Sequence, residues 1–301
     1  MRVLITGATG LIGSELVSDF RARNTDIHYL STSQKNLRNE PGYKGFFWDP
    51  ARGIIDENCM MGVDVIIHLA GASIAKRWTQ HYKQEIIESR IMSANLLYKT
   101  LKQNPHQVRQ VVSASAIGIY PDSQSATYTE DDKTVDNSFL GHVVVKWEAS
   151  VDKFKQLGLK VCKIRTGLVL SKKGGVLQEL VKPIKLGIGS PYGSGKHWQS
   201  WIHIEDLTAL YVSAVENQWE GVINAVAPNP VSNDELTRKT AKVLHKPFFM
   251  PHVPETVMKM MLGEMHQLLF ASQKVSPKRA VDGGFKFKFP ILDLALINIL
   301  S

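Results

Sequence analysis

The sequence predicts an α/β fold: a doubly wound parallel sheet with helices on both faces. Short, continuously apolar runs recur from the N-terminus to Val226, as in strands that are buried on both faces. Segments with helical periodicity separate these runs, which is the pattern of β-α-β units. After Pro228 only short helix-like segments follow. We therefore expect a main domain over residues 1–227 and a small, mostly helical region over residues 228–301.

The first strand is followed at once by a glycine turn and a helix. Val3–Ile5 is apolar, and Gly7, Gly10 and Gly13 follow at three-residue spacing. Such a turn lets the backbone approach a pyrophosphate, and the helix N-terminus attracts the phosphates with free N–H groups. The alternative is an ordinary tight turn, because the spacing is not Gly-x-Gly-x-x-Gly. The expected dinucleotide contacts here are Gly7, Thr9, Gly10, Leu11, Ile12 and Gly13.

The end of the second strand, Ile27–Leu30, indicates which dinucleotide is bound. An NAD site places an acidic residue there for the ribose 2′-hydroxyl, whereas an NADP site has a polar or basic lining for the 2′-phosphate. This segment has no acid before Glu40 and carries Ser31, Thr32, Ser33 and Lys35. The pattern favours NADP(H) over NAD(H), unless these are simply turn residues.

The remaining strands are predicted at Gly45–Asp49, Val63–Gly71, Gln110–Ala116, Leu159–Gly167 and Gly221–Val226. In a parallel sheet the carboxyl ends of the strands face the ligand crevice. We therefore expect further cofactor contacts from Leu69, Ala70, Gly71, Ser113, Arg165, Thr166 and Val169. No cluster of residues with metal-ligand spacing is present, so no metal site is predicted.

A long helix is predicted over Tyr82–Lys102, and a second over Phe139–Gln156. The first of these helices carries the candidate cofactor residues Glu85 and Arg90. Arg90 interrupts an apolar stripe and would reach across to the ligand. A surface ion pair is the alternative for Arg90. His68 lies inside a predicted strand, where a hydrogen-bonded core histidine is the favoured interpretation.

Taken together in order, the motifs resemble the short-chain dehydrogenase/reductase superfamily on its extended, NAD-dependent epimerase/dehydratase-like side. The shared segments are Ile5–Gly13, Leu69–Gly71, Glu88–Arg90, Ser113–Gly118, Trp147–Glu148, Gly193–Gly195, Ser200–Asp206, Asn224–Pro230 and Ser272–Arg279. The resemblance implies a Rossmann-type fold. It also implies a catalytic Ser or Thr, followed on the next helix by Tyr-x-x-x-Lys, in which the lysine lowers the pKa of the tyrosine.

This chain departs from that catalytic pattern. Ser115 matches the serine, but alignment on Trp147–Glu148 puts Leu140 in the tyrosine position and Val144 in the lysine position. The resemblance is therefore to an atypical subgroup that lacks the Tyr-x-x-x-Lys pair. His142 is the replacement proton donor that the helix offers, since histidine titrates near neutral pH. Its alternative role is that of an exposed helix residue.

Composition limits the remaining possibilities. The net charge of +8 comes from scattered Lys and Arg residues, so the sequence favours neither nucleic-acid binding nor a membrane partner. Met1 leads directly into the first strand, and both cysteines, Cys59 and Cys162, have apolar neighbours, so we expect a cytoplasmic protein with reduced thiols. A methionine- and leucine-rich segment over residues 258–269 would serve as core, as a homodimer surface or as a lid.

Three functions remain open from the sequence. The first is an NADP(H)-binding, epimerase- or oxidoreductase-like enzyme that acts on an unknown small molecule. The second is a catalytically silent nucleotide-binding sensor or scaffold, which the loss of the Tyr and Lys side chains would favour. A third function, nucleic-acid binding, is the weakest, because the positive charge is not concentrated on any motif.

Overall fold

The computed structural model describes all residues, Met1–Ser301. Its central sheet contains parallel strands in the order β13 (Gly221–Ala225), β9 (Lys160–Thr166), β7 (Gln110–Ala116), β6 (Val65–His68), β1 (Arg2–Thr6), β2 (Asp26–Ser31) and β4 (Tyr43–Asp49). Two short strands, β3 (Asn39–Glu40) and β5 (Ile54–Ile55), pair antiparallel with β4 at the edge. The predicted doubly wound parallel sheet is confirmed, with a small antiparallel addition.

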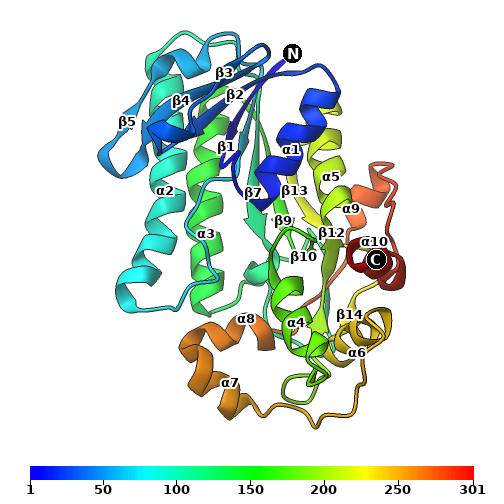
Figure 1. The fold of residues 1–301 in the computed structure, drawn as a ribbon. Helices are drawn as coiled ribbons and strands as arrows, with labels where there is room; N and C mark the ends of the chain where they lie inside the picture. The colour runs from blue at the N-terminus through cyan, green and yellow to red at the C-terminus, as the bar shows by residue number, and fades with distance from the viewer.

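Helices cover both faces of this sheet (Figure 1). On one face lie α2 (Gln80–Gln103) and α3 (Phe139–Asp152), and on the other lie α1 (Leu11–Ala22) and α5 (Ile204–Glu216). Successive strand residues point to opposite faces, so Val3 and Ile5 join the core beneath α1 and α5, whereas Leu4 joins the core beneath α2 and α3. This two-sided burial explains why the strands read as unbroken apolar runs.

The predicted element boundaries differ from the structure at helix ends and at one strand, since the strand predicted over Val63–Gly71 spans only Val65–His68 as β6. Helix α2 begins two residues earlier than Tyr82, because Thr79 caps it by accepting a hydrogen bond from the Tyr82 N–H. Helix α3 ends at Asp152 rather than Gln156. The chain continues there as a 3₁₀ helix over Lys153–Leu157 and stops at Gly158, which has a left-handed φ of 73°.

The lower part of the molecule is built from two separate stretches of chain (Figure 1). A third hydrophobic core contains residues such as Leu170 and Trp201 together with Leu236 and Leu296, so segments on both sides of residue 227 pack as one body. Two ribbons join segments on the two sides of residue 227: β11 (Trp198–Gln199) with β14 (Val231–Ser232), and β8 (Thr127–Tyr128) with β15 (Lys274–Val275). A third ribbon pairs β10 (Leu168–Leu170) with β12 (Trp201–His203), both before that residue.

The helices of this part are α4 (Val176–Lys185), α6 (Asn233–Val243), α7 (Glu255–Leu262), α8 (Gln267–Phe270), α9 (Lys278–Asp282) and α10 (Leu292–Leu300). Helix α6 begins after Ser232, whose hydroxyl accepts a hydrogen bond from the Glu235 N–H at 3.1 Å. The segment from α7 to α8 lies next to the lower end of α3 (Figure 1), and we call this segment the lid.

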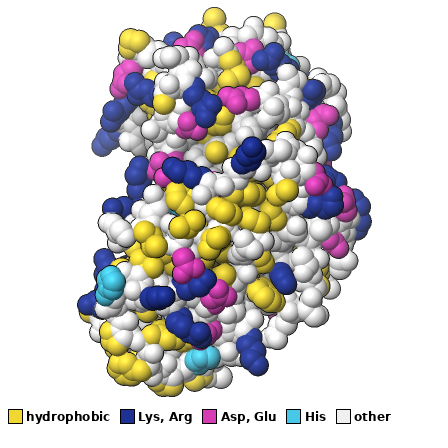
Figure 2. Space-filling view, turned by 90° about the vertical axis from the view of Figure 1, so that its right-hand side faces the viewer, with side chains coloured by type: hydrophobic (Ala, Val, Ile, Leu, Met, Phe, Trp, Pro, Cys, Tyr) yellow, Lys and Arg dark blue, Asp and Glu magenta, His cyan; other side chains and the backbone are white.

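The surface agrees with a dispersed positive charge. Figure 2 shows Lys and Arg side chains spread among acidic ones, around a patch of hydrophobic side chains at mid-height. None of the helices has the length and apolarity needed to cross a membrane. Cys59 and Cys162 are both free and buried, as predicted.

Candidate functional site

A cavity of about 780 Å³ opens at the carboxyl ends of β1, β2 and β6. This is the place where the sequence predicts the dinucleotide. Residues that sequence analysis singled out line it from four separate segments: Gly7, Thr9, Ser31, Thr32, Ser33, Ala70, Gly71 and Glu85. The fold therefore gathers most of the predicted segments around one concave site.

The glycine turn has the geometry of a phosphate cradle. Gly7 has a φ of +70°, and a Cβ on Gly13 would lie 2.1 Å from the Gly7 carbonyl oxygen, so both positions require glycine. Gly10 has an ordinary φ of −78° and serves as the N-cap of α1 without a side chain to cap it. The first N–H groups of α1 are thus free to bind an anion, and no acidic residue lies in that first turn. These residues fit a pyrophosphate.

The end of β2 presents hydroxyl groups to the same cavity. The Ser31 hydroxyl donates to the Ser33 carbonyl and accepts from the Ser33 N–H, both at 3.1 Å, which holds the turn. Thr32 is exposed, and Lys35 follows in the short 3₁₀ helix Gln34–Asn36. No carboxylate lies at the end of β2 itself, and the nearest strand-end carboxylate in the lining is Asp49, at the end of the neighbouring strand β4.

Two walls of this cavity were not predicted from the sequence. One is Trp48–Ala51, at the end of β4. The other is one face of α2: His81, Gln84, Glu88, Ser89, Met92 and Ser93, next to the predicted Glu85. The spacing of three and four residues places these side chains on one face of the helix, and this periodicity is visible in the sequence. The sequence does not show, however, which face of a long helix turns toward a ligand.

Arg90 lies where this cavity meets a second one. Its Nη1 donates to the carbonyl oxygens of Ala72 at 3.1 Å and Ile86 at 2.8 Å, and its guanidinium lies over the Trp147 ring. Burial lowers the pKa of Arg90 to about 10. The Nε atom is buried without a hydrogen-bond partner. The surface ion pair considered for Arg90 is therefore wrong, and its position suits a contact with a ligand that spans both cavities.

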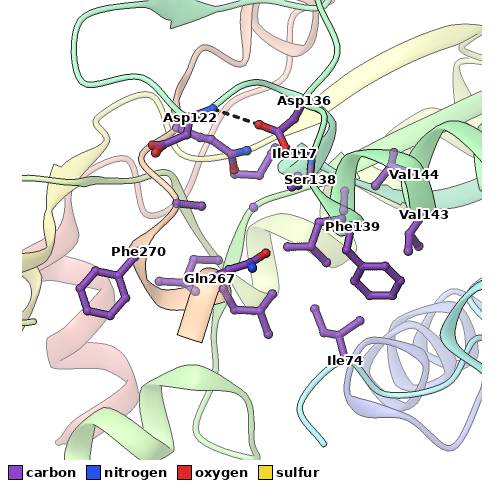
Figure 3. Close-up of a pocket in the computed structure, with 18 of the residues that line it drawn as sticks. Ile74, Ile117, Asp122, Asp136, Ser138, Phe139, Val143, Val144, Gln267 and Phe270 are labelled. Atoms are coloured by element: carbon purple, nitrogen blue, oxygen red, sulfur yellow. Dashed lines mark hydrogen bonds between the residues drawn. The ribbon is translucent and has the colours of Figure 1, made fainter. Parts of the chain in front are cut away.

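The second cavity, of about 720 Å³, lies between α3 and the lid (Figure 3). Phe139, Val143 and Val144 enter it from α3, while Gln267 and Phe270 enter it from α8. Leu140 also lines it, so both positions that the resemblance assigns to tyrosine and lysine face this cavity with aliphatic side chains. Thr166 and Gly167 lie at its inner end.

Ser115 does not line either cavity. Its hydroxyl donates a 2.6 Å hydrogen bond to Glu148, whose carboxylate also accepts from Arg165 Nε at 2.8 Å and Nη2 at 3.0 Å. Arg165 Nη1 donates further to the Tyr120 hydroxyl. The predicted roles of Ser115 in catalysis and of Arg165 at the cofactor gain no geometric support, because both side chains are engaged in this buried cluster. The residues that follow Ser115 and do line the cavity are Ala116, Ile117 and Gly118.

Charge and burial oppose each other at Glu148. Burial raises the pKa of its carboxyl, but hydrogen bonds and charges from Arg165, Ser115 and Lys163 outweigh this and hold that pKa below its usual value. The same pairing raises the pKa of Arg165 against the effect of burial. Glu148 is therefore a permanent anion at neutral pH, and Ser115 serves as its hydrogen-bond donor.

Several other predicted residues lie outside the cavities. His142 and Lys146 are exposed on the outer face of α3. Ser113 is fully buried, and its hydroxyl bonds to the Ala114 carbonyl. The predicted cofactor residues that line neither cavity are Gly10, Leu11, Ile12, Gly13, Lys35, Leu69, Ser113, Arg165 and Val169. The first four still surround the free N-terminus of α1.

His68 is a core residue, as expected. It is fully buried, with Nδ1 2.9 Å from the Thr6 hydroxyl and Nε2 3.3 Å from the Ser93 hydroxyl. Burial lowers the pKa of His68 to about 4, so the ring is neutral. Thr6 Oγ1 also accepts the N–H groups of Leu69 and Ala70 at 3.0 Å, which holds the turn beside the cavity.

The fold and the first cavity define a nucleotide-binding protein of the extended short-chain dehydrogenase/reductase type. The model of the NAD dependent epimerase/dehydratase family matches residues 3–226, and a domain of unknown function, DUF1731, matches residues 253–299. The chain belongs to the NAD dependent epimerase/dehydratase family.

Similar proteins extend over the full chain. Epimerase family protein SAR0825 of Staphylococcus aureus is 36% identical over 299 residues, covering 99% of this chain and 98% of the relative. The crystal structure of human epimerase family protein SDR39U1 with NADPH is 32% identical with a TM-score of 0.86, covering 99% of both chains. A nucleoside-diphosphate sugar epimerase from Corynebacterium glutamicum is 30% identical with a TM-score of 0.80, covering 100% of this chain and 58% of that one.

Proposed function

We propose that this protein binds NADP(H) in the first cavity and holds a small-molecule substrate in the second, as an epimerase- or oxidoreductase-like protein. The observation that carries the proposal is the end of β2, where Ser31, Thr32 and Ser33 line the cavity, Lys35 follows in the chain, and the strand ends without the acidic residue of an NAD site. The NADPH in the similar human SDR39U1 structure agrees with it.

The proposed contacts follow the shape of the cofactor. The Gly7–Gly13 turn and the N–H groups of Leu11 and Ile12 would hold the pyrophosphate, and Ser31–Lys35 the 2′-phosphate. Further contacts would come from Thr9, Leu69, Ala70, Gly71, Glu85, Arg90 and Thr166. The cofactor, when bound, supplies a hydride donor or acceptor. The apolar side chains of the second cavity would exclude water from that end.

We further infer that the family's proton-transfer pair is absent. Leu140 and Val144 stand in its two positions and cannot carry a proton, while Ser115 is bonded to Glu148 and His142 faces solvent. A positioned acid or base typically contributes about 10²–10⁴ in rate. We therefore expect slow turnover of the sugar-nucleotide, steroid and aldehyde substrates that such proteins are commonly tested with.

The cofactor assignment is tested by titrating NADPH and NADH against the wild type while following nicotinamide fluorescence. We expect tighter NADPH binding. Thr32→Asp, on the exposed turn, should weaken NADPH binding by about tenfold or more while leaving NADH binding unchanged, because a carboxylate repels the 2′-phosphate. Gly10→Val should abolish binding of both, and its negative φ lets the fold survive.

Equal or tighter binding of NADH by the wild type would refute the NADP(H) preference. Normal binding by a folded Gly10→Val variant would refute the cradle. If NADPH binds but no carbonyl or alcohol in a substrate panel is turned over, the silent sensor or scaffold becomes the better description. A robust rate that His142→Ala removes and Ser115→Ala leaves intact would instead make His142 the acid.

A further inference from the structure

The second cavity is poor in positive charge that a ligand could use. Its cationic side chains are Lys83 and Arg90. Lys83 is paired with the carboxylate of Glu264 on the lid, and Arg90 donates from Nη1 to the carbonyl oxygens of Ala72 and Ile86. The charge of Lys83 is therefore balanced within the protein, and Arg90, at the junction with the first cavity, has no carboxylate partner.

Negative charge, in contrast, is built into the rim of this cavity. Asp122 accepts the Ser272 N–H at 2.8 Å, and Asp136 accepts the Ser138 N–H at 2.6 Å and the Asp122 N–H at 3.3 Å (Figure 3). These backbone bonds hold both carboxylates in place at one end. The lid adds Glu255 and Glu264. Of these four carboxylates, Glu264 is paired with Lys83 and Glu255 lies 3.5 Å from His266 Nε2, whereas Asp122 and Asp136 have no cationic partner.

Most of the remaining wall is apolar. Ile74, Phe139 and Val143 form one side in Figure 3, and Ile117 lies near the carboxylates. The lid contributes Leu268 and Phe270. Gln267 points into the middle of the cavity, where its uncharged amide can donate to or accept from a single oxygen of a ligand. Such walls favour the transfer of an apolar ligand from water.

We propose that the second cavity binds an uncharged, largely apolar carbonyl or alcohol compound and rejects nucleoside diphosphates. The proposal deepens the proposed function, on which it rests for the cofactor in the first cavity. A diphosphate brings at least two negative charges, which would lie beside the fixed carboxylates of Asp122 and Asp136, whereas Arg90, a proposed cofactor contact, is the one lysine or arginine of the lining without a carboxylate partner. An apolar ligand meets no such cost and is oriented by its one oxygen at Gln267.

The test uses Nile red, an uncharged apolar fluorophore, with UDP-glucose as the competing sugar nucleotide. NADPH-loaded wild type should bind Nile red saturably, and millimolar UDP-glucose should neither displace it nor raise the melting temperature. Leu140→Asp should weaken Nile red binding by about tenfold or more. This position lies in the first turn of α3, where an aspartate favours the helix, so the variant should fold.

Two further variants sharpen the result. Ile74→Asp, in the loop before α2, should give the same loss as Leu140→Asp and covers the case in which that variant misfolds. Met260→Ser is the matched control, because Met260 is 78% exposed on the lid but does not line the cavity, and it should bind Nile red like the wild type.

The proposal is overturned if UDP-glucose displaces Nile red or stabilises the wild type. It is equally overturned if the wild type does not bind Nile red, or if both aspartate variants, shown to be folded by circular dichroism, bind it normally. NADPH binding is measured separately for each protein. Failure to bind NADPH would refute the proposed function, whereas Nile red binding without NADPH would still decide the nature of the second cavity.

Discussion

At the residue scale, the buried carboxylate of Glu148 determines what its neighbours do. It accepts hydrogen bonds from the Ser115 hydroxyl and from two nitrogens of Arg165. Lys163 Nζ lies 3.5 Å from the same carboxylate and 2.8 Å from Asp152. A buried charge must be paired, because removing one partner leaves the other desolvated. Ser115 and Arg165, which the sequence suggests as site residues, therefore serve as partners of a buried charge.

We predict that Glu148→Ala destabilises the fold by about 3–5 kcal/mol, because Arg165 is left buried without its counterion. Ser115→Ala should cost about 1.5–3 kcal/mol, the range for a hydrogen bond to a charged group. Urea unfolding measures both. If Ser115→Ala leaves stability unchanged but lowers turnover, Ser115 acts in catalysis and not as the partner of Glu148.

The same carboxylate makes stability depend on pH. The pKa of Glu148 is lower in the folded protein than the value of 4.5 for a free glutamate, so its contribution is present above that value and is lost as pH falls through the folded pKa. We predict that the melting-temperature difference between wild type and Glu148→Gln shrinks on acidification from neutral pH to about pH 3. A constant difference would mean that the folded and unfolded pKa values are equal.

At the element scale, α5 ties the last part of the chain to the sheet. The Asp206 carboxylate, in the first turn of α5, accepts the N–H groups of Lys288 at 2.7 Å and Phe289 at 2.9 Å. His203 caps the same helix, and its ring stacks on Phe289. His203 and Asp206 therefore have a structural role, since they join α5 to the segment before α10.

Trp198 and Trp201 lie in different surroundings. Trp201 is fully buried, whereas Trp198 lines the second cavity and donates from Nε1 to the Gln124 carbonyl. The two residues lie in neighbouring strands, β11 and β12, that pair with different partners. Their different surroundings follow from that pairing.

We predict that Asp206→Ala destabilises the protein by about 2–3 kcal/mol, since two backbone N–H groups lose a charged acceptor in the interior. Glu205→Ala is the matched control: it is the adjacent residue, and its partner is the exposed Lys288 ammonium, so little change is expected. Denaturant unfolding of both variants checks this, and equal losses would show that the carboxylate of Asp206 is not the anchor.

At the scale of the whole molecule, the two cavities meet at Arg90, between the sheet and the lower part of the molecule. Gly71 packs against the Arg90 side chain and lines the first cavity, while Arg90 lines the second. A ligand that occupies both would contact β1, β2, β6, α2 and the Thr166–Leu168 segment together. Binding should therefore stabilise the chain as a unit.

We predict that NADPH at about a hundred times its Kd stabilises the wild type by about 2.7 kcal/mol, or roughly 5 °C in melting temperature. The melting temperature of the Gly10→Val variant should be the same with and without NADPH. Calorimetry with and without the nucleotide measures this, and an equal shift in both proteins would mean that NADPH binds away from the glycine turn.

The predicted fold agrees with the structure where local sequence carries the information. Apolar runs locate the parallel strands, and the spacing of Gly7, Gly10 and Gly13 predicts a turn whose positive φ and close backbone contacts the structure contains. Helix ends were less well predicted, because the Thr79 cap and the Lys153–Leu157 continuation depend on a few weak bonds. The packing of residues 168–201 with the C-terminal helices has no local signal.

By itself, the sequence determined the order of strands and helices, the glycine turn and the hydroxyl-rich end of β2, because each depends on residues that are close along the chain. Only the tertiary structure decided that Ser115 bonds to Glu148, that His142 faces solvent and that Leu140 faces a cavity beneath the lid. The physical reason is that the direction of a side chain and the partners it meets depend on packing between distant segments, and a single periodic pattern does not encode them.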